Sequence, residues 1–106
     1  MLIGVPKEIK SQEYRVGLTP ESVSELVADG QEVWVETLAG AGIGALDSDY
    51  VDAGAKIKAT AKEIFASCEM IVKVKEPQAV ERAMLRPGQI LYTYLHLAPD
   101  LSLIHI

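Results

Sequence analysis

The chain has 106 residues, of which 49% are hydrophobic and 24% are charged, and its formal net charge is −5. This length suits a single domain, and the high apolar content excludes an intrinsically disordered chain. The acidic balance argues against a nucleic-acid partner, because binding phosphates requires a surplus of lysine and arginine. Charges or glycines interrupt every apolar run, so we expect no membrane span, no membrane partner and a cytoplasmic location.

Short apolar segments alternate with amphipathic ones along the chain. The strongest local signal is Thr19-Pro20-Glu21, which offers a capping hydroxyl, a proline at the first helical position and an acid near the positive end of the helix dipole. In chain order the pattern predicts a strand at 2–5, a helix from Thr19 to Gly30, a strand at 32–36, a short helix near 48–53, a weak edge strand at 56–58, a helix from Thr60 to Cys68, a strand at 70–74, a short helix from Pro77 to Pro87 and a strand at 89–95.

Strands separated by helices imply crossover connections, and these produce parallel strand pairs. We therefore predict an α/β fold, an open, mostly parallel Rossmann-like sheet with helices on both faces. In the short helix before the last strand, we expect Val80, Ala83 and Met84 to face the core.

The end of the chain does not follow this pattern. After Asp100 a helix should begin, but the chain stops at Leu-Ser-Leu-Ile-His-Ile, which resembles the translation of a sequencing adapter. We therefore predict that residues 1–100 form one incomplete domain and that residues 101–106, His105 included, are a non-native tail.

Polar side chains follow three of the predicted strands. Arg15 lies in the polar stretch after the first strand, Lys73 and Lys75 end the strand at 70–74, and His96 follows the last strand. Open α/β sheets bind ligands beyond the carboxyl ends of their strands. Arginine binds a carboxylate through a planar fork, lysine can hydrogen-bond a carbonyl or transfer a proton, and histidine is an acid–base group near neutral pH. Together they predict a site for a small anionic carbonyl compound.

Each of these residues also has an ordinary structural explanation. Taken alone, Arg15 is typical of a surface loop, Lys73 and Lys75 of solvated strand-edge positions, and His96 of a hydrogen-bonded structural histidine. The sequence leaves both interpretations open.

Other motifs favour structure over chemistry. Gly40 to Ala45 fits G-x-G-x-x-A, but it does not follow its strand tightly, and the next helix begins with Asp47 and Asp49, which would repel phosphate, so we predict a turn. Cys68 ends an apolar helical face and predicts a core thiol. One cysteine and two histidines favour neither a disulfide nor a metal site.

Four motifs together resemble the N-terminal domain of the alanine dehydrogenase family. In chain order they are Gly4-Val-Pro-Lys-Glu8, Glu13-Tyr-Arg-Val-Gly-Leu-Thr-Pro20, Lys73-Val-Lys-Glu-Pro77 and Thr93-Tyr-Leu-His-Leu-Ala98. The early motif is shared with the α subunit of the proton-translocating nicotinamide nucleotide transhydrogenase, whereas the last two are more specific to alanine dehydrogenases. The resemblance covers essentially residues 1–100.

This resemblance implies the reversible oxidative deamination of L-alanine to pyruvate and ammonium with NAD. It implies that Arg15 binds the substrate carboxylate, that Lys75 contacts the substrate and aids catalysis, and that His96 is the acid–base group at the carbonyl or carbinolamine oxygen. Tyr94 is expected to line the cleft. NAD is expected to bind to a domain absent from this chain, and the complete enzyme is expected to be a homo-hexamer.

Two alternatives belong to other classes. One is a nucleotide-binding module of the transhydrogenase, which would carry residues other than lysine and histidine at positions 75 and 96. The other is a stand-alone, non-catalytic domain.

Overall fold

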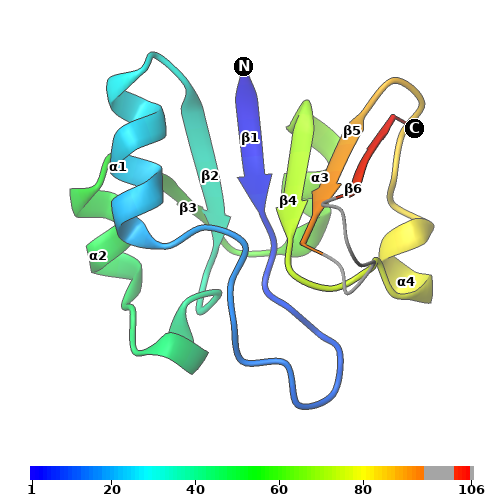
Figure 1. Cartoon of the computed structure of the whole chain (residues 1–106), viewed down its shortest axis with the longest axis horizontal. Coiled ribbons are helices and arrows are strands. Elements are labelled where there is room, and N and C mark those ends of the chain that lie inside the picture. The colour runs from blue at the N-terminus through cyan, green and yellow to red at the C-terminus, as the bar shows by residue number, and fades with distance from the viewer. Residues whose placement is uncertain (95–101, 106) are drawn as a thin grey trace.

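The computed structural model describes residues 1–94 and 102–105, the latter by their backbone alone. The elements follow the predicted alternation (Figure 1): β1 (Leu2–Val5), α1 (Pro20–Ala28), β2 (Glu32–Glu36), a 3-10 helix (Ala41–Ile43), α2 (Asp47–Asp52), β3 (Lys56–Lys58), α3 (Ala61–Ser67), β4 (Met70–Lys73), α4 (Ala79–Arg82), β5 (Ile90–Thr93) and β6 (Ser102–His105).

The strands form one sheet in the order β3-β2-β1-β4-β5-β6. Strands β1 to β5 pair in parallel, whereas β6 pairs antiparallel with β5. The predicted open, mostly parallel α/β sheet is therefore confirmed.

Strand β6 differs from the helix that we expected after Asp100. Its backbone pairs with β5 from Ile90 opposite His105 to Thr93 opposite Ser102. Without β6, the outer edge of β5 would present unpaired N–H and C=O groups, which a short segment in extended conformation can satisfy. The non-native origin proposed for residues 101–106 stays a prediction.

Two helix starts form as their local sequences predict. The Thr19 hydroxyl accepts a hydrogen bond from the Ser22 amide at 3.2 Å, and Pro20 is the first residue of α1. At α3, the Thr60 hydroxyl accepts from the Glu63 amide at 3.3 Å. Each cap satisfies an amide that has no partner within its own helix.

Two apolar clusters fill the space on opposite faces of the sheet, with α1 and α2 on one side and α3 on the other (Figure 1). Strand β2 shows the alternation, because Val33 and Val35 belong to the cluster with α1 and α2, whereas Trp34 packs against the other. On α3 and at its end, Ile64, Phe65 and Cys68 are fully buried. The predicted apolar face of this helix is thus confirmed.

The predicted inward face of α4 is wrong at Val80 and Ala83. Val80 is 61% exposed and Ala83 is also exposed. Met84 is partly buried against the apolar cluster that includes Ile64 and Phe65 of α3. The residue of α4 that faces inward is Glu81, whose side chain is 2% exposed. The reason is electrostatic, because Glu81 pairs with a buried lysine that a search for apolar residues does not consider.

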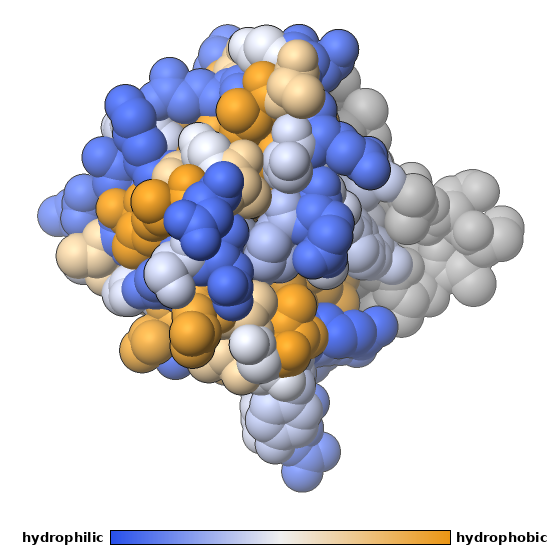
Figure 2. All heavy atoms as spheres, turned by 90° about the vertical axis from the view of Figure 1, so that its left-hand side faces the viewer, coloured by the Kyte–Doolittle hydropathy of each residue, from blue (hydrophilic) through white to orange (hydrophobic). Residues whose placement is uncertain are grey.

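The surface over α1 and α2 shows hydrophilic residues interspersed with several apolar areas (Figure 2). Large apolar side chains exposed between β2 and β3 are Leu38, Ile43, Leu46 and Val51. Scattered exposed apolar residues are ordinary on protein surfaces. Among the residues that the structure describes, no helix has the length and apolar character needed to cross a membrane.

Candidate functional site

The strand order places a crevice beyond the carboxyl ends of β1 and β4. After β1 the chain continues to β2 and β3 on one side of the sheet, whereas after β4 it continues to β5 on the other side. The connections that leave these two neighbouring strands therefore run in opposite directions. Ligands of open α/β sheets bind at such a switch point. The long segment between β1 and α1, which extends beyond this end of the sheet in Figure 1, carries Arg15, and Lys75 follows β4.

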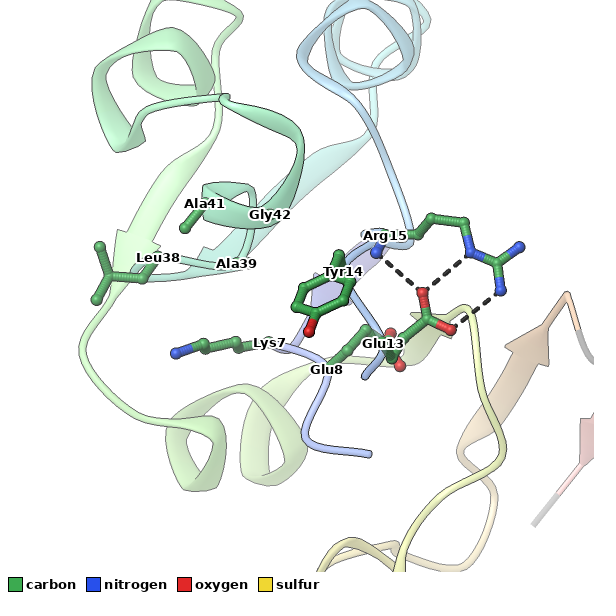
Figure 3. A pocket seen from close by; sticks show the side chains of 9 residues that line it. All are labelled: Lys7, Glu8, Glu13, Tyr14, Arg15, Leu38, Ala39, Ala41 and Gly42. Carbon is green, nitrogen blue, oxygen red and sulfur yellow. Dashed lines mark hydrogen bonds and ion pairs between the residues drawn. The ribbon is translucent and has the colours of Figure 1, made fainter. Parts of the chain in front are cut away.

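Arg15 and Glu13 form a two-pronged ion pair within this segment (Figure 3). The Arg15 Nε and Nη2 atoms donate to the two Glu13 carboxylate oxygens, each at 3.0 Å, and the Arg15 amide donates to Glu13 Oε2 at 2.9 Å. Hydrogen bonding to the guanidinium lowers the pKa of the Glu13 carboxyl, and the same contact raises the pKa of Arg15. The Arg15 side chain remains 65% exposed. Its Nη1 end, which Glu13 does not engage, can still bind an anion.

Lys75 approaches the same carboxylate. Its Nζ lies 4.0 Å from Glu13 Oε1, and its side chain is 28% exposed, compared with 4% for Glu13. The structure thus brings two of the predicted site residues, Arg15 and Lys75, to one shielded carboxylate. Both cations keep exposed surface beside this acid, and cationic side chains of this kind can bind a small carboxylate ligand.

The interpretation of Lys73 as a solvated strand-edge residue is wrong. Its side chain is 1% exposed, and its Nζ lies 3.0 Å from both Glu8 Oε1 and Glu81 Oε2. A buried ammonium needs such partners because losing its hydration is costly. Lys73 is therefore a structural residue beneath the site.

His96 lies outside the described residues, so its predicted place in the site stays a prediction. The neighbouring Tyr94 follows β5, and its hydroxyl donates a hydrogen bond to the Gly17 carbonyl. Burial raises the pKa of the Tyr94 hydroxyl, and its ring stands edge-on to Tyr92 with centroids 5.9 Å apart. Tyr94 thus ties β5 to the segment that carries Arg15.

Gly17 makes that attachment possible. A Cβ at this position would lie 2.4 Å from the Val72 carbonyl oxygen, so only glycine allows the segment to pass this close to β4. The sequence places Gly17 in a motif but does not reveal which backbone it approaches.

An open pocket of about 360 Å³ lies between the segment that carries Arg15 and the loop after β2 (Figure 3). Figure 3 shows the Tyr14 ring between Lys7 and Arg15, with the loop after β2 along one wall. The residues that line the pocket are Lys7, Glu8, Glu13, Tyr14, Arg15, Leu38, Ala39, Ala41 and Gly42. Sequence reasoning missed the wall formed by residues 38–42, because it considered that loop only as a possible phosphate site.

The small residues of this wall are the signal that could have revealed it. A Cβ on Gly42 would lie 2.2 Å from the Tyr14 carbonyl oxygen. The two loops can therefore approach each other only because position 42 lacks a side chain. Part of the glycine-rich stretch thus serves loop packing beside Arg15.

The same stretch does not fit the pyrophosphate of a dinucleotide. Residues 41–43 form a 3-10 helix, and α2 then begins with Asp47 and Asp49 in its first turn. Asp47 already accepts hydrogen bonds from the Thr37 hydroxyl at 2.5 Å and the Leu38 amide at 2.9 Å. These carboxylates occupy the positive end of the helix, where a phosphate would have to bind.

Comparison with known proteins identifies the family. The model of the alanine dehydrogenase/PNT N-terminal domain matches residues 4–105. This chain belongs to that family. The predicted resemblance is confirmed.

Curated relatives of this family member are named alanine dehydrogenase. The protein from Methanococcus maripaludis is 56% identical over 100 residues, and the protein from Bacillus subtilis is 51% identical over 100 residues; each alignment covers 94% of this chain. A solved L-alanine dehydrogenase structure has a TM-score of 0.86 at 55% identity and covers 92% of this chain, and a transhydrogenase structure from Sinorhizobium meliloti has 0.84 at 33% and covers 90%. The chain spans only 26–27% of the length of these relatives and structures.

Proposed function

We propose that this chain is the substrate-binding, N-terminal part of an alanine dehydrogenase that converts L-alanine and NAD reversibly to pyruvate, ammonium and NADH. The observation that carries the proposal is the meeting of Arg15 and Lys75 at the Glu13 carboxylate, at the switch point of the sheet. These two residues are the ones to which the family resemblance assigns the substrate. The high identity to alanine dehydrogenases supports the same conclusion.

In this proposal each side chain has a separate task. The Arg15 guanidinium binds the substrate carboxylate through its outer end, and Lys75 donates a hydrogen bond to the carbonyl oxygen of pyruvate. His96 exchanges a proton with that oxygen, or with the hydroxyl of the carbinolamine. NAD is the oxidant of the proposed reaction and would be bound outside residues 1–106, because the glycine-rich stretch does not fit it.

The transhydrogenase alternative shares the fold, as the Sinorhizobium meliloti structure shows. The fold therefore does not discriminate between the two functions. Lys75 favours the dehydrogenase, because the resemblance places another residue there in the transhydrogenase. We also propose that the complete enzyme is cytoplasmic and a homo-oligomer, the family resemblance implying a hexamer.

A hybrid enzyme tests the proposal. Residues 1–100 replace the matching segment of the Methanococcus maripaludis alanine dehydrogenase, and NADH-dependent reduction of pyruvate with ammonium is followed. Arg15→Lys should raise the KM for pyruvate about tenfold, because the planar fork is lost while the charge stays. His96→Ala should mainly lower kcat.

Val80→Ala, on the exposed side of α4, is the matched control and should leave both constants within about twofold. Unchanged kinetics in both site variants of an active hybrid would contradict the proposed site. The 106-residue chain by itself should show neither turnover nor measurable NAD binding in calorimetry, and turnover by the purified chain would refute the assignment of the cofactor to residues outside it.

A further inference from the structure

Three charged side chains are buried together beneath the candidate site. Lys73 ends β4, Glu8 lies in the segment after β1, and Glu81 lies on α4. Their side chains are 1%, 2% and 2% exposed, and Lys73 Nζ is 3.0 Å from an oxygen of each carboxylate. Burying ionised groups is unfavourable unless each finds close partners. Packing alone therefore does not explain why three charged side chains are buried here.

The two carboxylates do different things. Glu81 Oε1 accepts from the Gln78 amide at 2.8 Å, so Glu81 closes the first turn of α4. Glu8 instead accepts from the backbone of the segment that follows β4, with the Val74 amide 2.9 Å from Oε2 and the Lys75 amide 3.3 Å from Oε1. Of the two acids, Glu8 alone contacts the peptide from which Lys75 projects.

This arrangement fixes the starting point of the Lys75 side chain. Both amides come directly after the last residue of β4, where the strand ends. A short, buried carboxylate that binds both of them and the Lys73 ammonium leaves this peptide little freedom. The Lys75 side chain then extends to within 4.0 Å of Glu13, the partner of Arg15.

Glu8 and Arg15 belong to the same segment between β1 and α1. That segment therefore carries the arginine and, through Glu8, also determines where the lysine of the neighbouring strand is placed. The Arg15 amide donates to Glu13, and the Val74 and Lys75 amides donate to Glu8, so carboxylates of this one segment hold the backbone of both cations.

We infer that Glu8 is the positioning residue of Lys75, and that it acts by holding the Val74 and Lys75 amides at the end of β4. The inference rests on the proposed function, in which Lys75 contacts the substrate. Glu8 touches no substrate in this scheme. Its effect on catalysis passes through the backbone of Lys75.

Glutamine at position 8 is the informative change. Its side chain keeps one acceptor oxygen, but its amide nitrogen is a donor and would face either a backbone N–H or the Lys73 ammonium. Glu81→Gln is the matched control, because it removes the same charge from the same lysine and leaves residues 74 and 75 untouched.

The first measurement is amide hydrogen exchange by NMR in the 106-residue chain, with the amide of Ile71 in β4 as the internal reference for global opening. Relative to that reference, Glu8→Gln should speed exchange of the Val74 and Lys75 amides at least about tenfold, whereas Glu81→Gln should change it less than about threefold. Equal responses in the two variants would overturn the inference. So would an unsubstituted chain in which both amides exchange as fast as in an unfolded peptide.

The second measurement uses the hybrid enzyme. Glu8→Gln should lower kcat for pyruvate reduction at least about tenfold with the KM for NADH unchanged, and Glu81→Gln should keep kcat within about threefold. If Arg15→Lys raises the KM for pyruvate but Glu8→Gln and Glu81→Gln lower kcat equally, the inference alone fails. If Arg15→Lys has no effect in an active hybrid, the proposed function fails and the inference falls with it.

Glu8→Asp keeps the measurement possible if Glu8→Gln does not fold. Aspartate retains the charge for Lys73 but is one methylene shorter, so it should lose the two amide contacts first. Faster exchange at positions 74 and 75, with Ile71 unchanged, would support the inference. Unchanged exchange and unchanged kcat in Glu8→Asp would overturn it.

Discussion

Strand β4 joins two regions of this protein that are stabilised in different ways. Ile71, in its middle, belongs to the apolar cluster below α3, together with Ile64, Phe65 and Cys68. Lys73, two residues later, is as well buried but contacts the carboxylates of Glu8 and Glu81. An apolar side chain gains from burial whatever its neighbours are, whereas a buried charge is tolerated only where specific partners meet it. The apolar region therefore supplies stability, and the charged region fixes how three segments meet.

The largest effect should come from removing the shared cation. Lys73→Met leaves two ionised carboxylates buried without their partner and should lower the free energy of unfolding by roughly 3–5 kcal/mol at neutral pH. Urea unfolding followed by circular dichroism measures this value. A loss below about 1 kcal/mol would show that the charged region tolerates the same exchanges as the apolar one.

The apolar region should lose less stability when one of its side chains is shortened. Ile64→Val removes one methyl group from a fully buried side chain and should lower the free energy of unfolding by about 0.5–1.5 kcal/mol. The same urea titration applies, with Val80→Ala at the exposed face of α4 as a control that stays within about 0.5 kcal/mol. If Ile64→Val lowered the free energy of unfolding more than Lys73→Met does, the apolar region would be the more sensitive of the two.

The ion pair of Glu13 and Arg15 should contribute less, and in a pH-dependent way. The pKa of Glu13 is lowered in the folded protein from an ordinary value of 4.5, so its stabilising effect is complete above that value and is lost as the pH falls through the folded-state pKa. Because Arg15 is largely exposed, Glu13→Gln should cost about 0.2–1 kcal/mol at pH 7. Chemical unfolding at several pH values should show this difference shrinking below pH 4.5. A difference that grows in acid would contradict the pairing.

The smallest effect concerns Cys68, which ends the apolar face of α3. Burial raises the pKa of its thiol to about 12, so the reactive thiolate is nearly absent at pH 8. The folded chain should not react with a chromogenic disulfide reagent at that pH, and it should react at once after unfolding in guanidinium chloride. Rapid reaction of the folded chain would show that the apolar cluster opens easily.

The parts of the fold that the sequence predicted are those with local causes. Thr19, Pro20 and Thr60 act on amides within one turn of themselves, so the starts of α1 and α3 could be located from the sequence. The strand at 32–36 also has a local cause, because successive residues of a strand face opposite sides of the sheet, as Trp34 and its neighbouring valines do in β2. At the site, Arg15 and Lys75 were proposed from side-chain chemistry, from their places after strand ends and from the family resemblance.

The parts that the sequence did not predict depend on contacts between distant segments. The prediction of which residues of α4 face inward failed because Glu81 pairs with Lys73, which belongs to another element. The wall at residues 38–42 was missed because its approach to Tyr14 joins two separate loops. The role of Glu8 was not expected, since its partners lie 65–67 positions away.

By itself, the sequence determined the alternation of strands and helices and the family, and it supplied the side chains proposed for the site. Periodicity, capping and motif are properties of residues that are close in the chain, so they can be recognised from the sequence alone. Only the tertiary structure decided which lysine is buried and which is exposed to the site. Lys73 and Lys75 are two residues apart, and what separates them is the position of Glu8 and Glu13, both carried by a segment that reaches them only when β1 and β4 pair.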